Sequence, residues 1–472
     1  MNTSSRMLKT ITFLLLLYAC TNVAASEKPN ILFISIDDLR PELGCYGSEV
    51  AVTPSLDKLA DQGLLFDRAY CNYPICGASR ASLLSGLYPT SKRFVGLNPL
   101  DKYEPEAVTL PQAFKQNGYT TLSNGKIFHD SKDANERSWS EPAWRPNVST
   151  MASLDPATRR KLSKKKRGFI TEGPDVPDNA YFDGMVAEKT IADLGKLKAS
   201  GKPFFLACGF VKPHLPFYAP KKYWDFYERD KLPLATNRYR PKEAPADLKG
   251  SGEYNGYFLG DLKVNSDAWH REMLHGYLAC TSYADALTGQ VLDELDRLGL
   301  ADNTIVVVWG DHGWHLGEHN FWGKHNTLHN ALRVPLIVRL PKSFTEQATS
   351  KDKQTSALVE SVDLYPTICD LAGIDAPETL QGKSFRMLFK KPTSEFRRSV
   401  YARHKNAETL LTKRYAYTRF NGIGGPEMLF DHQTDPQENR NVAGKPAYAI
   451  TVDELSMDLD QRINDAINGG TN

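Results

Sequence analysis

The sequence predicts an α/β fold: a mostly parallel sheet sandwiched between helices, followed by a smaller C-terminal subdomain with an antiparallel sheet. Two observations support this prediction. Apolar runs of strand length recur along the chain and are apolar on both faces, as in parallel strands that are covered on both sides. Helical patterns, such as the one over residues 281–298, separate these runs, an alternation typical of parallel sheets.

The chain is long enough for one large domain and a smaller one, with 472 residues of which 41% are hydrophobic. We expect a catalytic α/β domain over residues 26–375 and an α+β subdomain over residues 376–472. In the subdomain, strands are predicted near Val400 and over residues 415–419, and a helix over residues 452–467. The predicted strands of the large sheet cover residues 30–36, 120–123, 203–208, 304–309 and 334–340.

The N-terminal segment over residues 1–25 has the pattern of a secretory signal peptide. Arg6 and Lys9 precede the apolar run 11–18, and the small residues 23–25 follow at cleavage spacing. A second interpretation is a bacterial lipoprotein signal, which would leave Cys20 lipidated and the protein attached to a membrane. Either way, we expect an exported protein, periplasmic or secreted.

The overall charge requires neither nucleic acid nor a membrane surface as a partner, because the formal net charge is only +2. A basic run over residues 159–167 is either a solvated loop or a rim that attracts a polyanionic substrate. The six cysteines beyond Cys20 are scattered without CxxC spacing, so they do not form a disulfide framework that replaces a core.

Polar side chains follow four of the predicted strands. In an open parallel sheet, ligands bind beyond the carboxyl ends of the strands, so these side chains should converge on one site. That convergence is more specific than any single residue, since two adjacent aspartates alone could be helix caps. The residues concerned are Asp37, Asp38, Lys126, His129, His214, Asp311 and His312.

A metal site is expected where Asp37, Asp38 and Asp311 meet His312. Clustered carboxylates repel one another unless a cation compensates, and an oxygen-rich site suits Ca²⁺ or Mg²⁺ better than zinc. Zinc remains an alternative, because histidines are frequent after Asp311. That stretch lacks an HExxH pattern and its glycines favour a loop, so we expect surface or supporting roles for His315, His319, His325 and His329.

Cys76 begins a helical pattern in the stretch YPICGASRASLLSG. A helix N-terminus favours an anion beside it, and Arg80 lies one turn along. The thiol could be a small buried hydrophobe, or a thiolate nucleophile with His129 or His214 as its base.

A third interpretation of Cys76 comes from a resemblance. The pattern of Cys76, Ala78 and Arg80 followed by Leu and Ser-Gly resembles the signature of type I sulfatases, in which this cysteine is oxidised to formylglycine. The segments DDLRPELGCYG, GKIFH, KPHLPF and GDHGWHLGEH, together with Lys324, are similar to the iduronate-2-sulfatase branch of that family. The resemblance implies an alkaline phosphatase/sulfatase-like fold. Ala78 stands where many members have proline.

The resemblance also implies roles for individual residues. Cys76, as a formylglycine hydrate, would supply the oxygen that attacks sulfur, and Arg80 would orient it. Lys126, Lys324 and His214 would surround the sulfate, with His214 or Lys324 as the acid and His129 as the base. Ca²⁺, or less typically Mg²⁺, would be held by Asp37, Asp38, Cys76, Asp311 and His312.

The expected function is therefore hydrolysis of sulfate esters on a sulfated, uronate-containing polysaccharide or oligosaccharide, for example algal ulvan or a glycosaminoglycan. Trp314, His315 and the basic run are candidates for choosing the sugar. The expected partner that matures Cys76 is a formylglycine-generating or anaerobic sulfatase-maturating enzyme. The alternatives are a phosphonate or phosphodiester hydrolase of the same superfamily and a non-catalytic glycan-binding protein.

Overall fold

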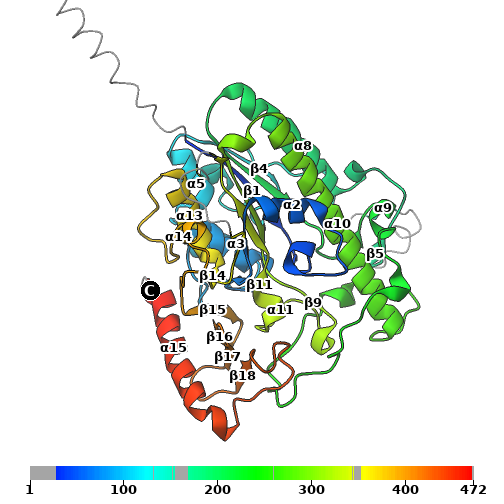
Figure 1. Cartoon of the computed structure of the whole chain (residues 1–472), viewed down its shortest axis with the longest axis vertical. Helices are drawn as coiled ribbons and strands as arrows, with labels where there is room; N and C mark the ends of the chain where they lie inside the picture. Colours follow the sequence, from blue (N-terminus) through cyan, green and yellow to red (C-terminus); the bar gives the residue numbers. More distant parts are fainter. Residues whose placement is uncertain are drawn as a thin grey trace, which may run out of the picture.

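A central sheet of seven strands runs through the larger part of the molecule (Figure 1). The computed structural model describes residues 28–130, 132–150, 153–154, 168–258, 260–342, 344 and 352–469. The expected signal peptide with Cys20 and the basic run 159–167 lie outside the described residues. In spatial order the strands are β13 (Gln354–Thr355), β2 (Leu64–Phe66), β12 (Leu336–Arg339), β8 (Thr304–Gly310), β1 (Asn30–Ile36), β6 (Phe204–Phe210) and β4 (Thr120–Gly125).

The register of the parallel strands places their carboxyl ends side by side. Ile36 at the end of β1 lies opposite Phe210 of β6 and Gly310 of β8, and β4 runs parallel to β6. The mostly parallel sheet is therefore confirmed. One predicted strand, 334–340, is wrong in its extent and direction: Pro335 separates β11 (Arg333–Val334) from β12, and β12 is antiparallel to β8.

Helices cover both faces of the sheet. Successive side chains of each strand point to opposite faces, and because the strands are apolar on both faces, each face needs a covering layer. Leu32, Ile34 and Ile36 of β1 belong to the apolar core beneath α2, α8 and α10. Ile31 and Phe33 belong to the core on the side of α3, α5 and α13. These helices are α2 (Pro54–Gln62), α3 (Cys76–Ser85), α5 (Leu110–Gln116), α8 (Phe182–Ser200), α10 (Asp267–Arg297) and α13 (Leu364–Ala372).

The helix predicted over residues 281–298 is the C-terminal half of α10. This helix starts at Asp267, where the Ser266 side chain accepts a hydrogen bond from the Trp269 N–H and caps the first turn. None of the helices in the described parts of the chain has the length and apolar character needed to span a bilayer.

The C-terminal part contains an antiparallel sheet with one helix packed across it (Figure 1). Leu455 and Leu459 of this helix share a core with Leu410 and Tyr417 of the sheet. The predicted strands near Val400 and at 415–419 correspond to the first and third strands, and the predicted helix is present. These elements are β15 (Ser399–His404), β16 (Ala407–Thr412), β17 (Tyr415–Phe420), β18 (Glu427–Asp431) and α15 (Ala449–Asn468).

Short elements connect the layers. The strands are β3 (Ala69–Tyr70), β5 (Thr171–Glu172), β7 (Phe217–Tyr218), β9 (His315–Leu316), β10 (Trp322–Gly323) and β14 (Val359–Glu360). The short α-helices are α4 (Leu100–Tyr103), α6 (Asn135–Ser138), α9 (Lys221–Trp224), α11 (His329–Leu332) and α14 (Met387–Lys390). The 3₁₀ turns are η1 (Gly44–Tyr46), η2 (Asp178–Ala180), η3 (Arg229–Lys231), η4 (Glu253–Gly256), η5 (Ala301–Asn303), η6 (Glu318–Asn320), η7 (Ser361–Asp363) and η8 (Pro446–Tyr448).

Candidate active site

The carboxyl ends of β1 and β8 bring three aspartates together. Asp37 and Asp38 follow β1 directly, and Asp311 follows β8. In a continuing strand, two adjacent side chains would point to opposite faces. Asp38 instead has a φ of +59°, so the chain turns, and its backbone N–H donates to Asp311 Oδ1 over 3.0 Å. The turn places all three carboxylates in one buried site.

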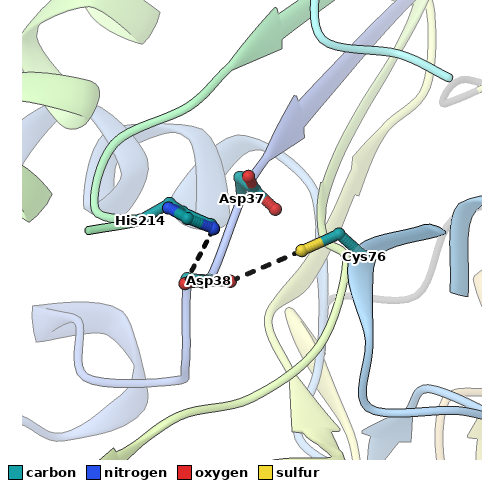
Figure 2. Close-up of side chains that lie close together, drawn as sticks. All are labelled: Asp37, Asp38, Cys76 and His214. Atoms are coloured by element: carbon teal, nitrogen blue, oxygen red, sulfur yellow. Dashed lines mark hydrogen bonds and ion pairs between the residues drawn. The ribbon is translucent and has the colours of Figure 1, made fainter. Parts of the chain in front are cut away.

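Cys76 is the first residue of α3, as its pattern predicted, and only 2% of it is exposed. Gly77 permits this position, because a Cβ there would lie 2.7 Å from the carbonyl oxygen of Gly96. The thiol sulfur lies 3.9 Å from Asp38 Oδ1 and 3.2 Å from His312 Nε2. Figure 2 shows the side chain reaching from the start of α3 towards the aspartates.

One cation accompanies each carboxylate. The Lys324 ammonium lies 2.7 Å from Asp38 Oδ1, and Arg80 Nε lies 3.0 Å from Asp311 Oδ2. The Lys126 ammonium pairs with Asp37. The structure therefore brings these residues together, as the sequence predicted. Within the described residues, Arg80 bonds to Asp311, Asp37 and two backbone carbonyls, and not to Cys76.

Burial and charge give the carboxylates different proton affinities. Burial would raise the pKa of Asp37, but Lys126 and Arg80 outweigh it and hold that pKa well below its usual range. Burial raises the pKa of Asp38 well above its usual range despite Lys324. Burial and the charge of Asp37 raise the pKa of Asp311 to about 7. The cations present therefore do not fully compensate the negative charge of Asp38 and Asp311 when both are ionised.

The same surroundings disfavour a reactive thiolate. Burial and the charge of Asp37 raise the pKa of the Cys76 thiol well above its usual range. A nucleophilic cysteine needs the opposite shift. The thiolate interpretation of Cys76 therefore finds no support in its environment.

The two histidines predicted as acid and base, His214 and His129, differ in their contacts with the aspartates. His214 Nε2 lies 3.9 Å from Asp38 Oδ2, and Figure 2 shows its ring facing the same carboxylate that Cys76 faces. His129 makes no side-chain hydrogen bond to the other site residues within the described chain, and its Nδ1 is buried without a partner. Burial and Lys324 lower the pKa of His214 to about 3, and burial and Lys126 lower the pKa of His129 to about 4. Both rings are neutral at pH 7.

Two overlapping groups of side chains could hold a metal ion among the described residues, each with its ligand atoms within 4.8 Å of one another. Asp37 and Cys76 belong to both groups. Four of the five predicted ligands form one group, and His214, which was predicted as an acid, joins Asp38 in the other. The groups are Asp37, Cys76, Asp311 and His312, and Asp37, Asp38, Cys76 and His214.

Surface or supporting roles were predicted for the later histidines, and two of them are buried rather than on the surface. His315 is fully buried and its Nε2 pairs with Asn326 Oδ1, and His319 is 2% exposed and bonds to the Gln437 carbonyl. The bond of His319 to Gln437 joins this loop to the C-terminal part, whereas His315 is enclosed by residues of the loop itself. Within the described residues, none of His315, His319, His325 and His329 belongs to either candidate metal group.

Two site residues carried no signal in the sequence. Glu253, in η4, lies 3.3 Å from the Lys324 ammonium, and Tyr277 of α10 donates to the Asp38 carbonyl. Glu253 lies in a glycine-rich loop without periodicity, and Tyr277 lies in the half of α10 that the helix prediction missed. The described cysteines are all unpaired, so no disulfide occupies Cys76.

Comparisons with known proteins identify the family to which the chain is similar. The model of the family described as Sulfatase matches residues 29–374, and that described as N-sulphoglucosamine sulphohydrolase, C-terminal, matches residues 317–465. The mouse (Mus musculus) protein iduronate 2-sulfatase is 33% identical over 411 residues, which cover 77% of this chain and 72% of the mouse protein.

Two solved structures share the fold. A protein in complex with its substrate D-glucosamine-2-N,6-O-disulfate superposes with a TM-score of 0.73 at 22% identity, over 94% of this chain and 99% of its own. A phosphonate monoester hydrolase from Silicibacter pomeroyi also has a TM-score of 0.73, at 24% identity over 92% of this chain and 95% of its own.

Proposed function

The chain belongs to the sulfatase family and is a sulfuric ester hydrolase, and on this premise we propose that it removes sulfate from a uronate-containing glycan through a formylglycine at position 76. The observation that carries the proposal is the position of Cys76. Its side chain starts a helix, is buried, and meets Asp38, His312 and Lys324 at the carboxyl edge of the sheet.

A divalent metal fits the residues present. Asp38 Oδ2 is buried without a hydrogen-bond partner among the described residues, and oxygen-rich donor sets suit Ca²⁺ or Mg²⁺. Burial and Lys324 lower the pKa of His312 well below its usual range, which keeps the ring neutral and able to act as a ligand. We propose that Asp37, Asp38, Asp311 and His312 hold Ca²⁺, which when bound supplies charge that lowers the proton affinity of a neighbouring hydroxyl.

Formylglycine would supply a hydrated aldehyde whose oxygen attacks the sulfur of the ester. The chain's own residues do the rest. Lys126 and Lys324 are protonated, because their carboxylate partners outweigh burial and raise the pKa of both lysines. In the proposed mechanism they neutralise sulfate oxygens, a contribution that is large in a buried site.

Proton transfer falls to the two histidines. A sulfate beside His214 brings negative charge that raises the pKa of this ring and favours its protonated form, so His214 can donate a proton to the leaving sugar oxygen. Lys324 is the alternative donor. His129, with a pKa of about 4, is unprotonated at neutral pH. It is suited to act as the base in the last step, which releases sulfate and regenerates the enzyme.

The proposed substrate is a uronic-acid 2-sulfate in a polysaccharide or oligosaccharide, supported by the similarity to iduronate 2-sulfatase. Export to the periplasm or the medium is proposed from the N-terminal segment, and maturation by a formylglycine-generating or sulfatase-maturating enzyme from the Cys76 motif. A phosphonate or phosphodiester hydrolase is the less favoured alternative, because the phosphonate hydrolase shares the fold at 24% identity whereas the sulfatase relative is 33% identical.

The decisive experiment is mass spectrometry of the peptide that contains Cys76, from protein made in its own host, combined with sulfate release from sulfated uronate oligosaccharides. An aldehyde in place of the thiol, together with released sulfate, is the expected result. An intact thiol in an active preparation would overturn the mechanism. Unchanged oligosaccharide with an intact thiol would favour the non-catalytic glycan-binding alternative.

A further inference from the structure

A cavity of about 320 Å³ lies between the catalytic part of the chain and the C-terminal sheet. Its wall combines three segments that are far apart in sequence: the loop at residues 247–252, the loop at residues 325–327, and the turn between β15 and β16. Both parts of the chain therefore contribute to one surface. The polar and charged residues that line the cavity include Asp247, Lys249, Asn326, His404 and Lys405.

This cavity adjoins the proposed sulfate position at two points of the backbone. His325, in its wall, directly follows Lys324, and Gly252, also in its wall, directly precedes Glu253. The carboxylate of Glu253 lies 3.3 Å from the Lys324 ammonium. The sequence neighbours of two residues that meet at the proposed sulfate position therefore line the cavity.

The cavity is rich in donors that lack partners. Lys249 and Lys405 are exposed, and neither ammonium has a carboxylate within ion-pair distance among the described residues. Asn326 is 4% exposed; its Oδ1 accepts from the Leu328 N–H, which fixes the orientation of the amide, and its Nδ2 is buried without a partner in the described chain. Buried donors without partners are rare in native proteins.

His404 adds a further donor or acceptor in a fixed position. It is 7% exposed, and its Nε2 has no partner among the described residues. The ring stacks on His325 with centroids 5.8 Å apart and an interplanar angle of 2°, and it packs edge-on against Tyr73. Asp247 is the one carboxylate in the wall, and its Oδ1 is occupied by the Asn421 amide. The cavity thus presents two ammoniums and fixed polar atoms to a ligand.

We propose that this cavity binds a second anionic group of the glycan, a carboxylate or another sulfate, through Lys405, Lys249 and Asn326. The inference rests on the proposed function and specifies which residues select its substrate. An ammonium suits either anion, and the amide donor without a partner offers a hydrogen bond to a ligand oxygen.

The test compares Lys405→Gln, Lys249→Gln and the double variant with the wild-type enzyme on three disaccharides. These are a neutral hexose monosulfate, a hexuronate monosulfate and a hexose disulfate. A charge-assisted hydrogen bond corresponds to roughly 10- to 100-fold, so kcat/KM should fall by about that factor on the substrate with the second anion and by much less on the neutral one. The affected substrate identifies the anion. Lys413→Gln, in the turn at the other end of the same sheet, is the matched control and should change none of the values.

An equal loss on all three substrates, or no loss on any, would overturn the proposal. Calorimetry with the sulfate-free hexuronate disaccharide separates this inference from the proposed function, because it needs no turnover. If the wild-type protein releases sulfate from no ester, the proposed function fails, while weaker binding of this disaccharide by Lys405→Gln would still support the cavity. Equal binding of the disaccharide by both proteins, with no loss on the disulfate, would remove the support.

Discussion

The ammonium of Lys324 lies 3.4 Å from the sulfur of Cys76, and both side chains are almost completely buried. Lys324 reaches this position from the loop that follows β10, with its ammonium 5.2 Å from the centre of a Trp314 indole ring. A fixed cation next to the proposed nucleophile can stabilise charge on the sulfate throughout the reaction.

Replacement of Lys324 by alanine should therefore lower kcat by about 10²- to 10³-fold, the usual cost of removing one preorganised donor from a reacting anion. The measurement is steady-state hydrolysis of a sulfated oligosaccharide, with mass spectrometry of the Cys76 peptide to confirm equal maturation. Lys413→Ala, an exposed lysine on the C-terminal sheet, is the control. A Lys324→Ala enzyme with unchanged kcat would exclude this role.

His214 should matter according to the leaving group. Its loss removes a proton donor that contributes about 10²- to 10⁴-fold for a sugar alcohol, whereas a nitrophenol leaves without a proton. His214→Ala should thus lose far more activity on sugar sulfates than on 4-nitrophenyl sulfate. Equal losses on both substrates would assign His214 to another role, for which its place beside Asp38 makes metal binding the first candidate.

The proposed base gives a prediction for pH. His129 must be unprotonated to act, and burial with Lys126 lowers its pKa to about 4. The rate of the step that His129 catalyses should therefore stay constant as the pH falls from 7 and decline only as the pH approaches 4. A pH profile of kcat for wild type, compared with His129→Gln, tests this. A decline that starts near pH 6.5 and is absent in the variant would mean that the pKa of His129 is not lowered.

Removal of the metal should weaken both activity and folding. The proposed ion would balance the charge of two buried carboxylates, Asp38 and Asp311, whose pKa values are raised without it. A ligand at 100 times its Kd stabilises the folded state by about 2.7 kcal/mol. Dialysis against a chelator should lower Tm and abolish sulfate release, and added Ca²⁺ should restore both. Unchanged Tm and activity after complete chelation, verified by elemental analysis, would contradict the proposed metal site.

Glu360 is expected to be critical for stability rather than for chemistry. This residue of β14 is 1% exposed and accepts from Arg397, from Arg462 of α15 and from the Tyr401 N–H. Removing one partner of a buried ion pair typically costs about 3 to 5 kcal/mol. Glu360→Ala should lower the free energy of unfolding in urea by about that amount. Glu454→Ala, an exposed residue of α15, serves as the control and should change it by less than about 0.5 kcal/mol.

The sequence predicted the centre of the fold better than its edges. The run over residues 30–36 predicted β1 in full, since the strand is buried along its whole length and its only polar residues are Asn30 and Ser35. The direction of β12 could not be predicted, since a buried strand has the same pattern whether parallel or antiparallel. The first half of α10 was missed although Ser266 is a recognisable cap, because polar residues interrupt its apolar pattern.

The same contrast holds for the site. Residues at strand ends, such as Asp311 and His214, could be predicted because topology alone brings strand ends together. Glu253 approaches Lys324 only through the path of an irregular loop, which leaves no periodic signal in the sequence. The burial of His315 arises within its own irregular loop, where its Nε2 pairs with Asn326 and its ring packs on Phe321, and such contacts leave no periodic signal in the sequence.

The burial of Cys76 limits the time during which another enzyme can reach its thiol. The Ser79 hydroxyl, one turn along α3, bonds to the carbonyl of Asp311, which lies 232 residues later in the chain. At a synthesis rate of about 5 to 20 residues per second, the Cys76 stretch exists for roughly 10 to 50 s before β8 is available to enclose it. A maturing enzyme cannot reach a thiol that is 2% exposed in the folded protein. If Cys76 is oxidised to formylglycine as proposed, the oxidation has to be completed while the chain is still incomplete or unfolded, and slow modification would leave a folded but permanently inactive product.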